Sequence, residues 1–516
     1  MIGLTNGIKA TIGVIDIDKQ CLPGSDICFG QIERLTRDAC KTCPKCGAGS
    51  WQADVEGHVD AQYQYGLPGS ATLELLPPIS GSLSLGSTTN FQTSEQGQNI
   101  ILTFEAAAGQ NLELALSSIT STSGTLNLAV YNSNGNYVNG QDCYQNPNYD
   151  NACVISLWNL ASGAYTVVLS PYQESDLISA DVTLTQDAVQ SIAVDQPIPV
   201  QLSAPGQLQR LEFNDTAGEP LDIAISNVST NPSGFAIGVS LLAPNGTQID
   251  SDSYDISSAG ALHEVALPQT GTYTILVQNE YGVVGTSTIE AIAPGSAPIS
   301  VDGASLNEST SIAGAAEYLS FSATAGENLE FALSNASESE PNPGIMINLY
   351  DSSGNYINGV ACPFDGEVGN PCMMSMWGLA AGNYILEVYP SGNNGNGTSG
   401  YGTESFTATL TQDLTGSIAT GQVVSVDLAR PGNLERLTFA GTAGSSPTVT
   451  VSNLTTSPAG HSVDVAVYDP TGALVTSGEF NAPGSLSLGS LSLTGNYQII
   501  VYGNNGVPAT LQVGLQ

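Results

Sequence analysis

The sequence predicts an all-β fold, in which four tandem antiparallel β-sandwiches of the jelly-roll or immunoglobulin-like kind follow a small cysteine-rich N-terminal head. A phrase that begins with Phe and ends with Ala-Gly occurs four times, and each copy is followed by segments of alternating apolar and polar residues, as in half-buried strands. Helical periodicity is nearly absent, and a Gly-x-Tyr phrase closes each copy. The opening phrases are FEAAAG (104–109), FNDTAG (213–218), FSATAG (321–326) and FAGTAG (439–444), and the closing phrases are GAYTVVL (163–169), GTYTILV (271–277), GNYILEV (382–388) and GNYQIIV (495–501).

The spacing of the copies sets the size of the modules. The glycines that end the four opening phrases lie 109, 108 and 118 residues apart, which is one small β domain per period, and 516 residues are too many for a single core. Copies one and three share a cysteine pair and a tryptophan that copies two and four lack, so a two-module unit is duplicated. We therefore divide the chain into a head (1–78) and modules A1 (79–187), B1 (188–295), A2 (296–413) and B2 (414–516).

The head combines three predicted elements with a linker. The alternation in ATIGVIDI predicts a strand over 10–17, residues 31–39 have the pattern of a short amphipathic helix, and residues 51–76 have the pattern of a hairpin. Pro77 and Pro78 then form a stiff linker to module A1.

Two aromatic positions recur inside the modules. The tyrosine of the closing phrase, Tyr165 in A1, stands at one corner of every module, and we expect its hydroxyl to bond to nearby backbone. Trp158 and Trp377 lie just before the same strand in A1 and A2. We expect both indoles in the core rather than on a carbohydrate-binding surface.

The net charge of −38 arises from a shortage of cations, because nine Lys and Arg stand against 47 Asp and Glu. Six of the nine lie in the first 46 residues beside five acidic residues, so the head is near neutral and the modules are strongly acidic. Such a surface repels phosphate backbones, which excludes nucleic acid as an expected partner. No stretch approaches the roughly 18 apolar residues of a membrane span, and we expect no secretory signal in the first residues.

The nine cysteines fall into two groups, of which the first lies in the A modules. Cys143 with Cys153, and Cys362 with Cys372, occupy matching places, and their loop-like flanks favour two local disulfides over buried free thiols. Disulfides form in oxidising compartments.

The second group lies in the head. The segment CPKCG has the knuckle shape that presents two thiolates to zinc or iron. The second Cys-x-x-Cys of a zinc ribbon is missing, so two disulfides with one cysteine left over are favoured over a zinc or iron site. The candidates for either role are Cys21, Cys28, Cys40, Cys43 and Cys46.

Four aspartates at turns or junctions, Asp187, Asp351, Asp413 and Asp469, are weak calcium candidates. Calcium binds several converging oxygens, but no Asp-x-Asp-x-Asp-Gly loop is present, so an aspartate in a turn is the default interpretation. No cofactor is assigned, and the candidates are calcium in the modules and zinc or iron at the head cysteines.

The inventory of catalytic groups predicts that the chain is not an enzyme. The sequence has three histidines, His58, His263 and His461, and none adjoins a cysteine or a Gly-x-Ser-x-Gly turn. It contains no phosphate-binding loop and no dinucleotide fingerprint.

The order of the phrases resembles the bacterial pre-peptidase C-terminal domain. The resemblance rests on Phe-x-x-x-Ala-Gly, a strand, Tyr-Asp/Asn-x-x-Gly and Leu-x-x-Gly-x-Tyr, and it covers about residues 80–516 once per module. It implies a jelly-roll-like sandwich in secreted bacterial or archaeal proteins, where the domain usually follows a hydrolase and assists secretion, solubility or attachment. Here the modules follow the head instead, and the calcium ligands of some relatives have no clear match.

These features together predict an extracellular or cell-surface structural protein, the subunit of a filament, sheath or surface layer. The expected partner is another copy of the chain, with the head docking on a neighbour's acidic module and its first strand pairing with an exposed sheet edge. One alternative is a secreted array of polysaccharide-binding modules with avidity from repetition, and another is a virion or phage fibre protein.

Overall fold

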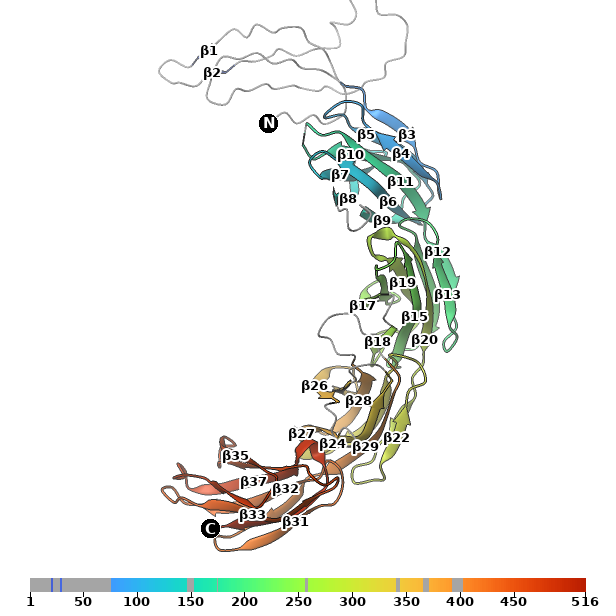
Figure 1. The fold of residues 1–516 in the computed structure, drawn as a ribbon. Helices are drawn as coiled ribbons and strands as arrows, with labels where there is room; N and C mark the ends of the chain where they lie inside the picture. The colour runs from blue at the N-terminus through green and yellow to red at the C-terminus, as the bar shows by residue number, and fades with distance from the viewer. Residues whose placement is uncertain are drawn as a thin grey trace, which may run out of the picture. The chain divides into compact units, whose positions relative to one another are not determined.

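The computed structural model describes residues 20–21, 28–29, 76–145, 153–173, 175–255, 259–339, 344–364, 371–391 and 402–516 (Figure 1). These residues form strands and turns, and the helices among them are the single 3-10 turns η3 (Glu280–Gly282) and η4 (Asn504–Gly506). The all-β prediction is confirmed. In the head, β1 (Gln20–Cys21) pairs with β2 (Cys28–Phe29). The predicted strand at 10–17, the helix at 31–39, the hairpin up to residue 75 and Cys40, Cys43 and Cys46 lie outside the described residues.

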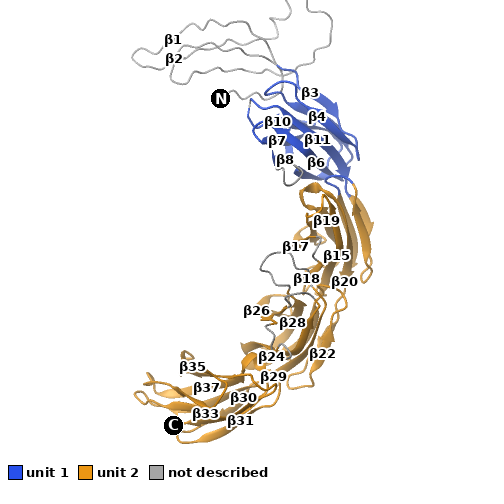
Figure 2. Cartoon of the chain, in the orientation of Figure 1, with its two compact units in different colours: residues 1–187, 204–207 blue, residues 188–203, 208–516 orange. Residues whose placement is uncertain are grey.

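The chain divides into two compact units, residues 1–187 with 204–207 and residues 188–203 with 208–516 (Figure 2). The prediction of a head and four separate domains stays a prediction. In the first unit, the strands of A1 are β3 (Ile79–Ser82), β4 (Thr88–Gln92), β5 (Ile100–Ala106), β6 (Gln110–Ser121), β7 (Thr125–Asn132), β8 (Tyr137–Tyr144), β9 (Cys153–Leu160), β10 (Gly163–Pro171) and β11 (Ile178–Gln186).

The strands of the second unit repeat this series. Those of B1 are β12 (Ala188–Ser191), β13 (Ile198–Leu202), β14 (Leu208–Asp215), β15 (Leu221–Asn231), β16 (Ile237–Leu242), β17 (Gln248–Tyr254), β18 (Gly260–Glu264), β19 (Gly271–Asn279) and β20 (Val284–Ile292). Those of A2 are β21 (Ser296–Pro298), β22 (Leu306–Ser309), β23 (Glu317–Ala323), β24 (Glu327–Glu338), β25 (Gly344–Asp351), β26 (Tyr356–Pro363), β27 (Cys372–Leu379), β28 (Gly382–Pro390) and β29 (Glu404–Gln412). Those of B2 are β30 (Leu414–Ser417), β31 (Val423–Leu428), β32 (Leu434–Gly441), β33 (Thr448–Thr456), β34 (Val463–Tyr468), β35 (Leu474–Phe480), β36 (Gly484–Ser487), β37 (Gly495–Gly503) and β38 (Ala509–Leu515).

Every module forms one five-stranded and one four-stranded sheet with the same strand order. In A1 the orders are β3-β5-β10-β7-β8 and β4-β11-β6-β9. The prediction of antiparallel sheets fails for the first strand of each module, which runs parallel to its neighbour, as β3 does to β5. The reason is the connection: β4 joins the other sheet before the chain returns as β5, and such a crossover permits a parallel pair.

Each pair of sheets encloses its own hydrophobic core. In A1, Leu102 and Val167 of the five-stranded sheet belong to one cluster with Leu114 and Val182 of the four-stranded sheet, and all four side chains are fully buried. Corresponding clusters occupy B1, A2 and B2. Burial of alternate residues from two sheets is what the period-two pattern predicted.

The expected corner tyrosines are confirmed. The Tyr165 hydroxyl donates to the Ala161 carbonyl over 3.0 Å, and the Tyr384 hydroxyl donates to the Ala380 carbonyl over 2.8 Å. Each ring also stacks on the phenylalanine of the opening phrase, as Tyr165 does on Phe104 with ring centroids 5.2 Å apart. The two recurring phrases therefore meet in space, which explains why they recur together.

The two predicted disulfides are confirmed, and each joins the outer strands of a module's two sheets. Cys143 of β8 bonds to Cys153 of β9, and Cys362 of β26 bonds to Cys372 of β27, with Cα atoms 5.5 and 5.7 Å apart.

The B modules place a buried aromatic ring where the A modules have the first cysteine of the disulfide. Cys143 pairs with Leu126 in register, and in the same place Tyr254 pairs with Ile237 and Phe480 with Val463. Both rings are buried. A buried aromatic side chain in the B modules thus stands where the A modules have a disulfide-bonded cysteine.

Replacement of both Cys362 and Cys372 by Ser should lower the free energy of unfolding of A2 by about 2–3 kcal/mol, because the bond closes a short loop in the unfolded chain. Differential scanning calorimetry of the variant and the native chain measures the change, and reductant added to the native chain should reproduce it. Reductant that leaves every transition in place would contradict the prediction.

Candidate functional site at the junction of A2 and B2

Two of the four calcium candidates accept hydrogen bonds from the backbone of the turns in which they lie. Asp351 Oδ1 accepts hydrogen bonds from the backbone N–H of Ser353 and Asn355 at 2.8 and 3.0 Å. Asp469 Oδ1 accepts in the same way from Thr471 and Ala473, at 2.8 and 3.0 Å. Bonds from the Asn355 and Thr471 side chains, with these backbone bonds, lower the pKa of the two carboxyls. Within the described ranges no group of three or more His, Cys, Asp or Glu is arranged to hold a metal ion, and calcium stays a prediction.

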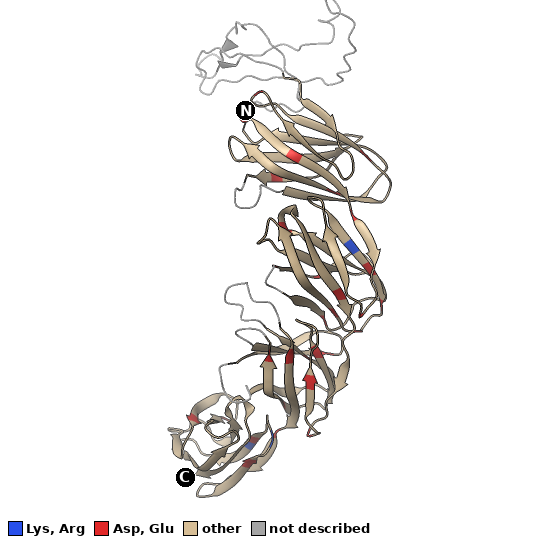
Figure 3. Ribbon diagram, turned by 45° about the vertical axis from the view of Figure 1, so that its right-hand side comes forward, with Lys and Arg blue, Asp and Glu red and all other residues tan. Residues whose placement is uncertain are grey.

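The other two candidates are buried, and Asp413 forms an ion pair with an arginine side chain. Asp187 and Asp413 are 5% and 8% exposed. Asp413 lies between β29 and β30, where A2 passes into B2, and its Oδ2 accepts a hydrogen bond from Arg436 Nε of β32. Basic residues are scarce in the described chain (Figure 3), so this ion pair is a distinctive feature of the junction.

Glu330 of β24 is the second carboxylate of this cluster, and its side chain is fully buried. Its Oε1 accepts a hydrogen bond of 2.7 Å from Trp377 Nε1, and the charge of Asp413 acts on its carboxyl. Glu330 Oε2 and Asp413 Oδ1 are buried without a hydrogen-bond partner among the described residues. Burial raises the pKa of Glu330 to about 8. Burial also raises the pKa of Asp413, although Arg436 opposes this shift. Because burial disfavours two negative charges at this place, we expect the two carboxyls to share a proton.

The expectation that the tryptophans lie in the core is wrong. Trp377 is 46% exposed and Trp158 is 47% exposed. Trp158 Nε1 donates to Glu113 within A1 over 3.0 Å, just as Trp377 donates to Glu330 within A2. The indole N–H needs an acceptor, and in both modules the acceptor is a carboxylate on the neighbouring strand of the four-stranded sheet.

The ring of Trp377 is fixed from a second side by Arg436, whose guanidinium carbon lies 4.3 Å from the ring centroid. Trp377 also contacts Tyr468 of B2 edge-on, with centroids 6.4 Å apart. Arg436 therefore bridges Asp413 and Trp377, and the cluster joins A2 to B2 through charge and aromatic contacts together.

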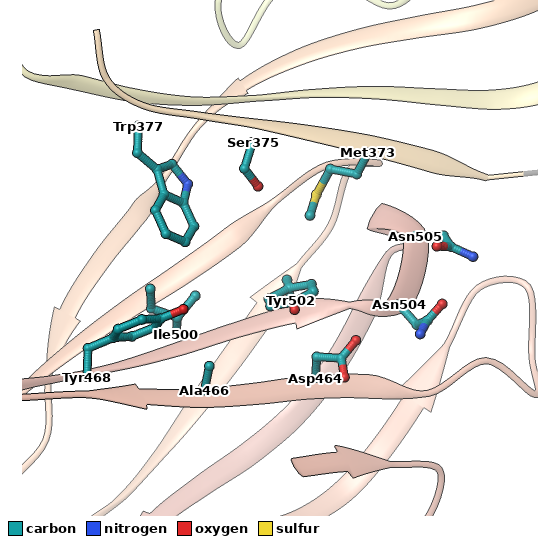
Figure 4. A pocket seen from close by; sticks show the side chains of 10 residues that line it. All are labelled: Met373, Ser375, Trp377, Asp464, Ala466, Tyr468, Ile500, Tyr502, Asn504 and Asn505. Carbon is teal, nitrogen blue, oxygen red and sulfur yellow. The ribbon is translucent and has the colours of Figure 1, made fainter. Parts of the chain in front are cut away.

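Beside this cluster lies a cavity of about 370 Å³, which we call the junction pocket. Trp377, Ser375 and Met373 of β27 line one side, and side chains of β34, β37 and η4 line the other (Figure 4). The residues from B2 are Asp464, Ala466, Tyr468, Ile500, Tyr502, Asn504 and Asn505.

A second polar cluster joins B1 to A2. Asp222 of β15 is fully buried and accepts hydrogen bonds from the Ala316 N–H at 2.9 Å, the Tyr318 hydroxyl at 2.8 Å and His263 Nδ1 at 3.0 Å. Burial lowers the pKa of His263, but the charge and hydrogen bond of Asp222, together with the charges of Glu387 and Asp250, outweigh burial, so the pKa lies above its ordinary value. Tyr318 also approaches Glu387 at 3.4 Å.

Sequence reasoning missed both clusters, although a signal was present. Leu221–Ile225 and Leu329–Leu333 are runs of five buried residues, so the period-two burial fails there. Both faces of these strands are covered, one by the module's own core and the other by a neighbouring module. A lone carboxylate at an outward position of an apolar strand, such as Asp222 or Glu330, marks such a covered face.

Comparison with known proteins gives one family match. Residues 98–171 match the model of the bacterial pre-peptidase C-terminal domain. No curated protein matches the chain.

Three solved structures illustrate the likeness. The pre-peptidase C-terminal domain of a collagenase from Bacillus anthracis is 15% identical, with 21% of this chain and 97% of that chain covered and a TM-score of 0.17. A periplasmic inhibitor of g-type lysozyme from Aeromonas hydrophila is 19% identical, with coverages of 20% and 99% and a TM-score of 0.15. A triple jelly-roll structure from the turret assembly of an archaeal virus is 14% identical, with coverages of 68% and 86% and a TM-score of 0.15. TM-scores this low support no inference about function. The first repeat of the chain thus contains a segment similar to the bacterial pre-peptidase C-terminal domain, as its motifs predicted.

Proposed function

We propose that this protein is an extracellular structural subunit of a filament, sheath or surface layer, in which four β-sandwich modules form the body and the N-terminal head joins neighbouring copies. The observation that carries the proposal is the way consecutive modules are joined. The B1–A2 and A2–B2 junctions hold buried, hydrogen-bonded charges, Asp222 in one and Glu330 with Asp413 in the other. Such junctions resist bending between neighbouring modules, as the body of a structural subunit requires.

Further features support an extracellular site and a structural role. The two disulfides favour an oxidising compartment, and the resemblance of residues 98–171 to the bacterial pre-peptidase C-terminal domain is compatible with a secreted protein. Among the described residues there is no helix with the length and apolarity of a membrane span. The near-neutral head and the acidic modules are complementary in charge, which supports head-to-module contacts between copies.

Electron microscopy of the purified full chain over rising protein concentration tests the assembly. We expect ordered filaments or sheets, and we expect Lys41→Glu with Lys45→Glu to abolish them, because the reversed charges meet an acidic partner surface. The matched control, Lys41→Arg with Lys45→Arg, keeps the charge and should assemble normally. A native chain that stays monomeric at every concentration, or a charge-reversed variant that assembles as well as the control, would overturn the proposal.

A further inference from the structure

We propose that the junction pocket binds an oligosaccharide that is uncharged or carries amino groups. The cavity of about 370 Å³ falls in the lower part of the roughly 300–1,000 Å³ range of small-molecule sites, which are frequent where domains meet. This binding activity is separate from the assembly proposed above, because it concerns residues of A2 and B2 and not the head.

Two aromatic side chains, Tyr502 and Tyr468, offer separate stacking positions along the pocket. Tyr502 of β37 pairs in register with Asp464 of β34, and Tyr468 lies four residues further along β34, so the Cα positions of the two tyrosines are about 13 Å apart along the strand direction. Ala466 and Ile500 leave a shallow floor between them. Pyranose rings present apolar C–H faces that stack on aromatic rings. Two separate stacking positions therefore suit an extended chain of sugars better than a compact ligand.

Polar groups stand at the edge of the same pocket. Asp464, Asn504, Asn505 and Ser375 offer acceptors and donors of the kind that pair with sugar hydroxyls (Figure 4). Among the described residues, the lining contains one carboxylate and no basic side chain. An oligosaccharide of uronic acids would therefore meet repulsion from Asp464, whereas a neutral or amino-substituted one would not.

The tryptophan at the pocket's edge is held in place before any ligand arrives. Glu330 binds the Trp377 indole N–H at 2.7 Å, and Arg436 lies on the ring, yet 46% of the residue stays exposed. An aromatic side chain fixed from behind loses little conformational entropy on binding. This arrangement suits a binding platform.

The equivalent strands of B1 form the same sheets without these groups. Tyr468 ends β34 as Leu242 ends β16, and Tyr502 pairs with Asp464 in β34 as Gln278 pairs with Gly238 in β16. B1 forms the same two sheets with leucine, glutamine and glycine in those places. The aromatic and acidic groups of B2 are thus additions to a module that folds without them.

The same comparison supplies the test variant, Tyr468→Leu with Tyr502→Gln, which gives B2 the residues of B1. Isothermal titration of the full chain with cellotetraose, mannotetraose, the tetramer of glucosamine and tetragalacturonate should show saturable binding of at least one of the first three. Tetragalacturonate should bind at least about tenfold more weakly than the best of them, and the double variant should lose at least about tenfold in affinity.

Three results would overturn the proposal: no binding of the first three probes at about 5 mM, equal affinity in the native chain and the variant, or a preference for tetragalacturonate. Calorimetric melting of the variant verifies that B2 is folded, and Tyr468→Leu alone serves if the double variant does not fold. Electron microscopy of the folded variant separates this proposal from the structural one, because assembly through the head should persist without saccharide binding.

Discussion

Replacement of Asp222 by Ala should lower the free energy of unfolding of the B1–A2 pair by about 3–5 kcal/mol, one of the two largest losses that we expect from single substitutions in this chain. The carboxylate is fully buried and accepts three hydrogen bonds, so its removal takes this acceptor from the Tyr318 hydroxyl, the Ala316 N–H and the partly buried His263. Calorimetry of the full chain measures the loss as a lowered transition temperature.

The loss should also depend on pH in a defined direction. Because the folded-state pKa of His263 lies above its ordinary value, the His263–Asp222 pair contributes fully below about pH 6.5, and its contribution falls as pH rises through the folded pKa. The deficit of the variant should therefore shrink from pH 6 to pH 9. Asp252→Ala is the matched control, since Asp252 is an exposed aspartate of the same module. A control as destabilised as Asp222→Ala would contradict the account.

The sequence alone predicted those parts of the fold that repeat. Strand alternation, turn glycines and the corner tyrosine are local features, and each recurs in four copies, so Tyr165 and its counterparts were placed correctly. The disulfides were predictable because Cys143 and Cys153 recur as Cys362 and Cys372 at the same separation. Residues that recur at matching places in several modules could therefore be assigned a structural role from the sequence alone.

What the sequence did not reveal depends on the contacts between modules. Trp377 was expected in the core because tryptophan is usually buried, yet its N–H is bound by Glu330 on the face that B2 partly covers. Parallel pairing of β3 with β5 escaped notice because strand patterns carry no direction. The junction pocket needs Trp377 and Tyr468 from two modules, and no spacing rule connects residues 91 positions apart.

Replacement of Arg436 by Met should lower the free energy of unfolding by about 3–5 kcal/mol at pH 8 and by much less near pH 5. Methionine keeps most of the side-chain volume but leaves Asp413 and Glu330 buried without their cation. Carboxyls in the unfolded chain titrate near pH 4, and here burial already raises the pKa of Glu330 to about 8. A raised carboxyl pKa removes stability as pH rises from the unfolded to the folded value. Arg436 lowers the pKa of Asp413, so its loss raises that pKa further in the variant, and the deficit should grow as pH rises. Calorimetry at both pH values measures it.

Two further variants test whether this effect arises from the contact of Arg436 with the two buried carboxyls. Arg430→Met removes a cation at the same junction that donates to the neutral Gly303 carbonyl, so its effect should be smaller and nearly independent of pH. Glu330→Gln mimics the protonated acid, because an amide can accept from Trp377 and donate to Asp413 at once. It should leave stability at pH 5 almost unchanged and raise it at pH 8, which is close to the pKa of the buried native carboxyl, so that about half of it is ionised. If Glu330→Gln were destabilising at both pH values, Glu330 would have to be ionised in the folded protein, and the shared proton between the two carboxyls would be refuted.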